Sequence, residues 1–191
     1  QTPYGFYPQL ERLLGKIHTA FDLSAISEFT VEAGRPDTIT EEKLRVLAQN
    51  GVDRISINPQ SMNDDVLAAI GRKHSAKDVL NTYQTARKIG FRVINMDTIA
   101  GLDGDTPESF AETMRTLVSL KPENITVHTL AVKRGANHND RIQAVSRHET
   151  VRKMLEASTQ ILTAAGYSPY YLYRQKFMAG GYENVGWTRQ G

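Results

Sequence analysis

Apolar positions along this chain follow two different spacings, one typical of strands and one typical of helices. Compact apolar runs predict strands at residues 28–33, 54–58, 91–99, 125–132 and 170–173. Between these runs, apolar residues three or four positions apart predict helices at residues 8–21, 40–50, 66–70, 76–89, 107–120 and 148–165. Residues 133–147 are polar without a clear period and predict a loop. The chain therefore alternates helix and strand almost throughout.

Several of the predicted helices have recognisable ends. Thr40 is a predicted N-cap, because it precedes acidic residues that suit the first turn of a helix. Pro107 is placed where the first turn of another helix would begin. Gly90 and Gly166 follow the last apolar residues of two further helices, where glycine commonly ends a helix.

The alternation of strand and helix is typical of parallel βαβ units, so we expect an α/β fold with a parallel sheet. Such a sheet belongs either to a doubly wound fold or to a barrel, and the periodicity does not distinguish the two. In both architectures ligands bind at the carboxyl ends of the strands. Polar residues at those ends are therefore the first candidates for a site.

Composition excludes several classes of protein. The net charge is +2, from 23 basic and 21 acidic residues that are interspersed, so we expect no nucleic-acid partner. No apolar run has the length of a membrane span, and the first residues lack the pattern of a signal peptide, which together indicate a cytoplasmic protein. Cysteine is absent, which excludes disulfides, thiolate nucleophiles and a cysteine-bound iron–sulfur cluster within these residues.

Four successive predicted strands carry polar groups near their carboxyl ends: Glu32, Gln60, Asp97 and His128. Each also has a structural interpretation. Glu32 could be a solvated acid, and His128 could be a hydrogen-bonded core histidine. Asp97 lies in an apolar run, where an unpaired charge is costly, and could form a structural ion pair with Arg54 or Arg72. The five histidines form no close pair of the kind that binds a metal.

Basic residues gather in the polar segment after the fourth predicted strand, where Lys133, Arg134 and Arg141 lie. They could be a solvated surface. They could also bind a carboxylate-rich ligand, because the arginine guanidinium pairs with carboxylates through two hydrogen bonds.

Several segments in combination resemble one known family, the radical S-adenosylmethionine (radical SAM) coproporphyrinogen oxidases and dehydrogenases. These segments are residues 29–40, 54–60, 70–74 and 94–102. Residues 127–134 and 170–176 look most like the oxygen-independent coproporphyrinogen dehydrogenase subgroup. The resemblance extends from Thr2 to about Trp187, nearly the whole chain.

The resemblance implies an open, three-quarter (β/α) barrel of the TIM type. In that family the first strand precedes a three-cysteine segment that binds a 4Fe–4S cluster, and here Thr2 resembles the end of the motif that follows the second strand. We therefore expect this chain to be a fragment whose first barrel strands and cluster ligands lie outside it. Residues 1–166 would form the partial barrel, and residues 167–191 would begin a C-terminal extension of the same catalytic unit.

The family's ligand contacts transfer to individual positions of this chain. The resemblance implies that Glu32 binds the ribose of S-adenosylmethionine and that Thr2 lies near the amino-acid end of this cofactor. Four further positions would line the cofactor or a second S-adenosylmethionine molecule: Gln60, Arg72, Asp97 and Ala131. We take Lys133, Arg134 and Arg174 as candidates that bind the carboxylates of the substrate.

The resemblance also implies a reaction and its partners. Reductive cleavage of S-adenosylmethionine would yield a radical that takes hydrogen from a propionate of a porphyrinogen, and loss of carbon dioxide would leave a vinyl group. An electron-donor protein would be the second partner. The fragment alone should be inactive, because it has no cluster ligands. Two alternatives stay open: a heme-binding chaperone related to these oxidases, and an unrelated barrel enzyme acting on a phosphorylated metabolite.

Overall fold

The computed structural model describes residues 7–130, 138–173 and 182–189, with the backbone only for Tyr7 and residues 138–147. Its helices are α1 (Tyr7–Ala20), η2 (Pro36–Thr38), α2 (Glu41–Gln49), α3 (Asp64–Ala69), α4 (Ala76–Ile89), α5 (Pro107–Leu120) and α6 (His138–Ala164). Its strands are β1 (Thr30–Gly34), β2 (Arg54–Gln60), β3 (Val93–Ala100), β4 (Asn124–Thr129), β5 (Tyr167–Tyr173) and β6 (Asn184–Arg189).

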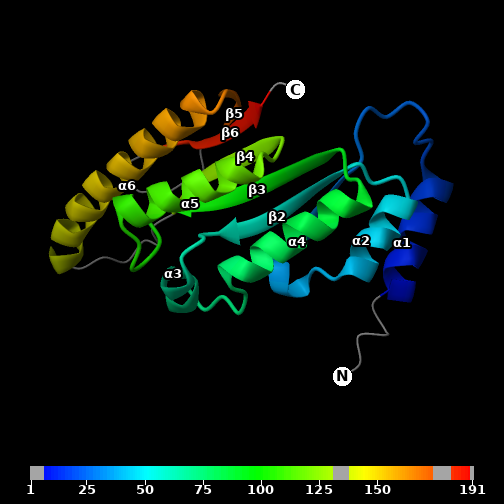
Figure 1. The fold of residues 1–191 in the computed structure, drawn as a ribbon, viewed down its shortest axis with the longest axis horizontal. Helices are drawn as coiled ribbons and strands as arrows, with labels where there is room; N and C mark the ends of the chain where they lie inside the picture. Colours follow the sequence, from blue (N-terminus) through cyan, green and yellow to red (C-terminus); the bar gives the residue numbers. More distant parts are fainter. Residues whose placement is uncertain (1–6, 131–137, 174–181, 190–191) are drawn as a thin grey trace.

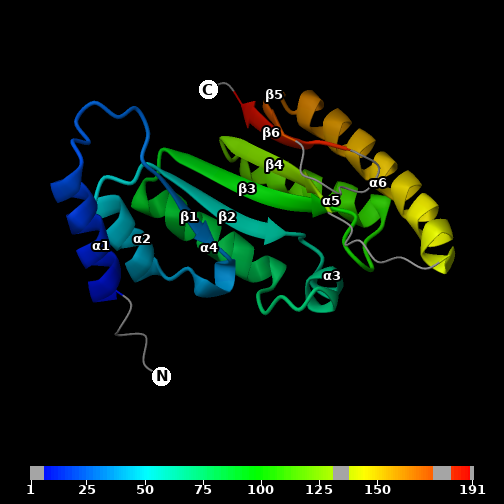
Figure 2. The ribbon, with the colours of Figure 1, turned by 180° about the vertical axis from the view of Figure 1, so that it is seen from behind.

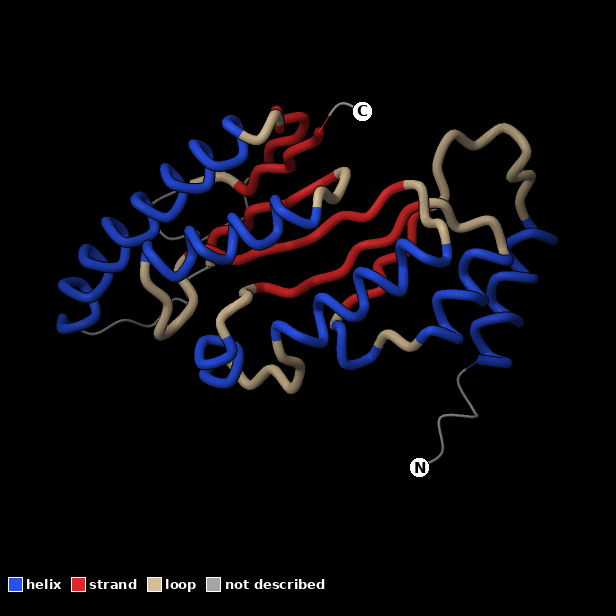
Figure 3. The backbone as a smooth tube through the Cα atoms, viewed as in Figure 1, coloured by secondary structure: helices blue, strands red, loops and turns tan. Residues whose placement is uncertain are grey.

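The strands form one sheet in the order β1-β2-β3-β4-β6-β5. Strands β1 to β4 are parallel to one another, whereas β6 runs antiparallel to both β4 and β5. The expected α/β class with a mainly parallel sheet is therefore confirmed. The helices lie on one side of the sheet, as Figures 1 and 3 show, and Figure 2 shows the opposite face without a helix over it.

The helix-covered face of the sheet is apolar because alternate residues of the central strands point toward the helices. Six of these side chains are almost completely buried: Ile55, Ile57, Ile94, Met96, Ile125 and Val127. Phe110, Met114 and Leu117 of α5 pack into the same core. The intervening residues of the strands point to the other face, and these are largely polar.

Local signals explain most of the helix boundaries. The Thr40 hydroxyl accepts a hydrogen bond from the backbone N–H of Lys43, which confirms it as the N-cap of α2. Ser75 and Asp78 form a reciprocal capping box at the start of α4. Gly90 ends α4 with a φ of 100°, a left-handed conformation that glycine adopts without strain.

In the second half of the chain one expectation is wrong and one strand was not predicted. Helix α6 begins at His138, ten residues before the expected start, so the segment from that residue onward is not a loop. This first part of α6 is polar and has no apolar stripe, so its sequence carries no helical period. Strand β6 was not expected, because Gly186 interrupts its short apolar pattern. It lies between β4 and β5, which therefore are not neighbours.

Gly101 lets α6 approach the end of β3. Its φ is 91°, and a Cβ added there would lie 2.7 Å from Cγ2 of Val151 in α6. The Gly101 amide also contacts the sulfur of Met154 at 3.2 Å. A side chain at this position would both strain the backbone and displace the helix.

We expect Gly101→Ala to lower the free energy of unfolding by about 1–3 kcal/mol, from backbone strain and overpacking together. Gly15→Ala is the matched control, because Gly15 is exposed within α1 and a Cβ there meets nothing within 4 Å. That control should gain about 0.5–1 kcal/mol from the better helix propensity of alanine. Urea unfolding followed by circular dichroism measures the stability of both variants. Equal stabilities would refute the close approach of α6 to Gly101.

Tyr167 fixes the start of β5 and gives stability a defined pH dependence. Its hydroxyl donates a hydrogen bond to the carbonyl oxygen of Pro122 at 2.6 Å, and burial raises its pKa to about 12. An unfolded tyrosine loses its proton near pH 10, so stability should fall as the pH rises above about 10. The loss is the difference between the free energies of unfolding at about pH 8 and near pH 11, each measured by urea unfolding. Tyr167→Phe should make this difference smaller by about 1 kcal/mol, because phenylalanine has no proton to lose.

Candidate functional site

The uncovered face of the sheet carries a hydrogen-bonded polar network centred on Asn95. The Asn95 side-chain amide donates to the hydroxyl oxygen of Ser56 (3.1 Å) and to the Asp97 carboxylate (2.7 Å). Its oxygen accepts from the Thr126 hydroxyl at 3.0 Å. Ser56 in turn donates to the Glu32 carboxylate at 3.1 Å. The network thus links β1, β2, β3 and β4 and holds two carboxylates on one face.

Asp97 is partly buried, and its partners differ from those expected. Nε2 of His128 on β4 lies 3.8 Å from Asp97, close enough for an ion pair when the imidazole is protonated. Neither of the expected arginines pairs with Asp97 in the described part of the chain. Arg54 instead pairs with Glu28 at 3.3 Å, so the structural ion pair suggested for Arg54 and Asp97 is wrong.

These residues line a hollow of about 340 Å³ on the uncovered face. Figure 2 shows the strands that form its floor. All of its lining residues are polar or aromatic: Glu28, Thr30, Glu32, Arg54, Ser56, Asn95, Asp97, Thr126, His128, Tyr170, Tyr171 and Tyr173. Most of these residues occupy alternate positions of the strands, as expected for side chains that share one face.

The hollow contains more acidic than basic groups. Glu28, Glu32 and Asp97 contribute three carboxylates, whereas Arg54 is the permanent cation among the lining residues. Burial lowers the pKa of Arg54, but its hydrogen bond to Tyr170 and its pairing with Glu28 outweigh this effect and raise the pKa. Arg54 therefore stays charged and offsets part of the acidic character. The remaining negative charge favours a ligand with a cationic group.

Strand β2 ends in a strained turn that also points to a ligand. Gln60 has a φ of 69°, a costly conformation for a residue other than glycine, and strain of this kind gathers at functional sites. Its side chain is buried, and its Oε1 has no hydrogen-bond partner within the described structure. Thr129, at the carboxyl end of β4, has a buried hydroxyl in the same situation. Unsatisfied polar atoms near strand ends suit hydrogen bonds to a bound molecule.

His74 packs against the end of β2 and hydrogen-bonds to its backbone. This buried side chain donates from Nε2 to the carbonyl oxygen of Pro59 at 3.1 Å, directly before Gln60. Its Nδ1 lies 3.6 Å from the Asp37 carboxylate in η2. His74 therefore connects the segment after α3 with the end of β2 and with η2, which follows β1.

The structure brings together some of the expected site residues. Glu32 and Asp97 line the same hollow and share one hydrogen-bond network. Gln60 and Arg72 are not among the lining residues in the described structure, since Gln60 ends β2 and Arg72 follows α3. Five expected residues lie outside the described residues or side chains: Thr2, Ala131, Lys133, Arg134 and Arg174.

Ser56, Asn95 and Thr126 were not anticipated as site residues. The sequence does contain a signal for them, because polar and apolar residues alternate along most of β2 and β4. Parallel strands covered by helices on both faces are almost continuously apolar, so this alternation indicates one face without helices.

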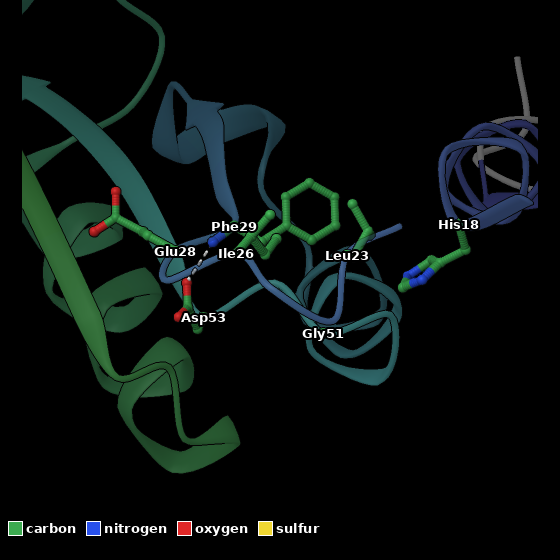
Figure 4. Close-up of a pocket in the computed structure, with 7 residues that line it drawn as sticks. All are labelled: His18, Leu23, Ile26, Glu28, Phe29, Gly51 and Asp53. Carbon is green, nitrogen blue, oxygen red and sulfur yellow. Dashed lines mark hydrogen bonds between the residues drawn. The ribbon is translucent and has the colours of Figure 1, made fainter. Parts of the chain in front are cut away.

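A second hollow, of about 220 Å³, lies at the amino ends of β1 and β2 and shares Glu28 with the first (Figure 4). His18, Leu23 and Ile26 line it together with residues that precede β1 and β2. There the Asp53 carboxylate accepts a hydrogen bond from the backbone N–H of Phe29 at 3.0 Å and pairs with Arg92 at 2.8 Å. Because these contacts tie the starts of the strands together, this hollow has a structural explanation.

Within the described residues, no group of three or more histidine, aspartate, glutamate or cysteine side chains could hold a metal ion. No helix in the same part of the chain combines the length and apolar character needed to cross a membrane.

The fold is similar to that of coproporphyrinogen III oxidase HemN from Escherichia coli, which is described as a radical SAM enzyme. The TM-score is 0.73 over 96% of this chain and 40% of that chain, at 24% sequence identity. This similarity shows the fold and confirms the expected partial barrel, whose sheet is open.

Two curated proteins of Bacillus subtilis (strain 168) are similar in sequence. HemZ, named an oxygen-independent coproporphyrinogen-III oxidase-like protein, is 46% identical over 172 residues, which are 89% of this chain and 34% of HemZ. The heme chaperone HemW is 40% identical over 126 residues, which are 65% of this chain and 33% of HemW. The chain spans about a third of the length of these relatives.

The model of the Radical SAM superfamily matches residues 4–117. The match covers more than half of the chain and includes β1, β2 and β3, which carry Glu32, Asn95 and Asp97. The chain therefore belongs to the radical SAM superfamily, within a group of relatives that includes oxidase-like proteins and heme chaperones.

Proposed function

We propose that this chain is part of a radical SAM coproporphyrinogen dehydrogenase, which converts propionate side chains of a porphyrinogen to vinyl groups. The observation that carries this proposal is the 46% identity to the oxidase-like HemZ across 89% of the chain. The oxygen-independent coproporphyrinogen III oxidase of Escherichia coli, 32% identical over 123 residues, supports the same chemistry. The complete reaction belongs to a longer protein, of which these residues form one part.

S-adenosylmethionine fits the polar hollow. It carries a cationic sulfonium and an ammonium group, which suit the three carboxylates there, and ribose hydroxyls that can donate to a carboxylate such as Glu32. Asp97 is held by Asn95 in a fixed orientation, so it can accept hydrogen bonds without reorganisation. Outside the lining of this hollow, at the end of β2, Gln60 offers a further acceptor, an amide oxygen without a partner in the described structure. When bound, the cofactor supplies the radical chemistry that defines the superfamily.

The chain does not fit a 4Fe–4S cluster, because it contains no cysteine to bind iron. The cluster of the proposed enzyme is therefore assigned to a different segment. The roles of Lys133, Arg134 and Arg174 as partners of the substrate carboxylates, and of an electron-donor protein, form part of this proposal.

A heme chaperone is the alternative function, favoured by the 40% identity to HemW. Both functions involve a tetrapyrrole ligand. They differ in what happens to the ligand, since the chaperone binds heme and the dehydrogenase changes the side chains of a metal-free porphyrinogen.

Removing the charge of Asp97 should weaken cofactor binding. We expect Asp97→Asn to reduce the affinity for S-adenosylmethionine by about 10- to 100-fold, the contribution of one charged hydrogen bond. Isothermal titration calorimetry on the 191-residue chain measures this change. Glu41→Gln is the control, because Glu41 is an exposed acid on α2 paired with Arg45. Equal effects of the two substitutions would contradict a cofactor site at Asp97.

The 191-residue chain should not cleave S-adenosylmethionine, even with iron, sulfide and a reductant, because it has no cysteine ligands. A protein that joins this chain to a cluster-binding segment should cleave the cofactor and release carbon dioxide from coproporphyrinogen. Mass spectrometry of the tetrapyrrole detects the loss. Tight heme binding without decarboxylation would instead support the chaperone function.

A further inference from the structure

Three tyrosines of β5 line the polar hollow: Tyr170, Tyr171 and Tyr173, which we call the tyrosine wall. Tyr170 and Tyr171 are nearly half exposed although they belong to this hollow. The rings of Tyr171 and Tyr173 stack, with centroids 5.7 Å apart, and those of Tyr170 and Tyr171 are 6.2 Å apart. An aromatic surface therefore borders a site whose other side chains are mostly polar or charged.

A β-bulge in β5 turns two consecutive tyrosines, Tyr170 and Tyr171, toward Gly186. The pairing of β5 with β6 moves from Pro169 opposite Trp187 to Tyr171 opposite Gly186, which leaves Tyr170 as the extra residue. Neighbouring residues of a regular strand point to opposite faces, and a bulge removes this restriction. Both rings consequently lie against Gly186.

Gly186 provides the space that the two rings occupy. A Cβ added there would lie 3.0 Å from Cε1 of Tyr170 and 3.1 Å from Cδ1 of Tyr171. Gly186 pairs with Thr126, and Thr126 pairs with Asp97, so the sheet register aligns Tyr171 with Asp97. The aromatic surface and the acidic site thus share one row of the sheet.

Arg54 fixes Tyr170, one member of the tyrosine wall. Its Nη2 donates to the Tyr170 hydroxyl at 3.2 Å, although three strands lie between β2 and β5 in the sheet. Arg54 also pairs with Glu28. This contact requires a strongly curved sheet, which brings the tyrosines over the polar face. The tyrosine wall is therefore in position before a ligand binds.

We propose that the tyrosine wall stacks against a pyrrole ring of the tetrapyrrole ligand. This inference rests on the proposed function and adds an orientation to it. A pyrrole ring is flat and uncharged, and tyrosine rings suit such a partner through stacking. The carboxylates of Glu28, Glu32 and Asp97 repel the propionates of the ligand, so the ring enters the hollow while the propionates point away from these acids.

Binding of coproporphyrin III to the 191-residue chain tests the inference directly. Quenching of Trp187, the single tryptophan, reports binding because it lies on β6 beside Gly186. We expect Tyr171→Ala to weaken binding about tenfold, whereas Tyr171→Phe, which keeps the ring, stays within about twofold of the parent. Gly186→Ala should also weaken binding, because it displaces both rings.

Leu172→Ala is the matched control, since Leu172 is 59% exposed on the same strand and does not line the hollow. Its porphyrin affinity should equal that of the parent, and circular dichroism verifies that each variant folds. Unchanged affinity in Tyr171→Ala, or no porphyrin binding by the parent chain, would overturn the inference.

The adenine of S-adenosylmethionine is a second flat ring, so each variant is also titrated with this cofactor. Weaker cofactor binding with unchanged porphyrin binding in Tyr171→Ala would assign the wall to adenine and overturn the inference. The decarboxylation assay tests the proposed function separately. If porphyrin binding depends on Tyr171 but the joined protein does not decarboxylate coproporphyrinogen, the inference stands and the dehydrogenase function is refuted.

Discussion

Asn95 is the centre of the uncovered face, because its side chain binds groups on its own strand β3 and on both neighbours, β2 and β4. Both of its donated hydrogen bonds and its accepted one go to protein groups, so the amide has little freedom to turn. Ser56 extends the connection to Glu32 on β1. A network of this kind is stable only when its members satisfy one another. Two of its bonds end on carboxylates, those of Asp97 and Glu32, and fix their positions. The geometry of the acidic hollow follows from these contacts.

The opposite face supplies the stability that permits such a polar surface. Isoleucine, methionine and valine side chains of β2, β3 and β4 are almost fully buried against the helices, whose approach is close enough that Gly101 meets Val151. Burial of this apolar area is the dominant favourable contribution to folding. The sheet can therefore leave its other face to polar groups and to a ligand.

Charge sets how the two proposed ligands share the polar hollow. The carboxylates of the hollow attract the cationic groups of S-adenosylmethionine, and the same charges repel the propionates of a tetrapyrrole. The tyrosine wall offers an uncharged surface within that acidic site. An anionic substrate can thus approach a cationic cofactor with its rings toward the sheet, and the basic residues proposed for its carboxylates belong to segments after β4 and β5.

Sequence alone determined the features that depend on near neighbours. The cap at Thr40, the glycine that ends α4 and the cores of β2 and β3 follow from local spacing and side-chain chemistry. The absence of cysteine excluded a cluster within these residues. Family resemblance named Glu32 and Asp97 as cofactor contacts, and that role stays a prediction. The cap and the strand cores can be predicted from the sequence because each depends on interactions between residues a few positions apart.

The tertiary structure decided which distant groups meet. It placed β6 between β4 and β5, gave Asp97 His128 as a partner instead of an arginine, and brought Tyr170 to Arg54. It also showed Ser56, Asn95 and Thr126 acting together, although each is an unremarkable polar residue in its own strand. These contacts depend on sheet order, register and curvature, which arise from packing of the whole sheet and which no short segment specifies.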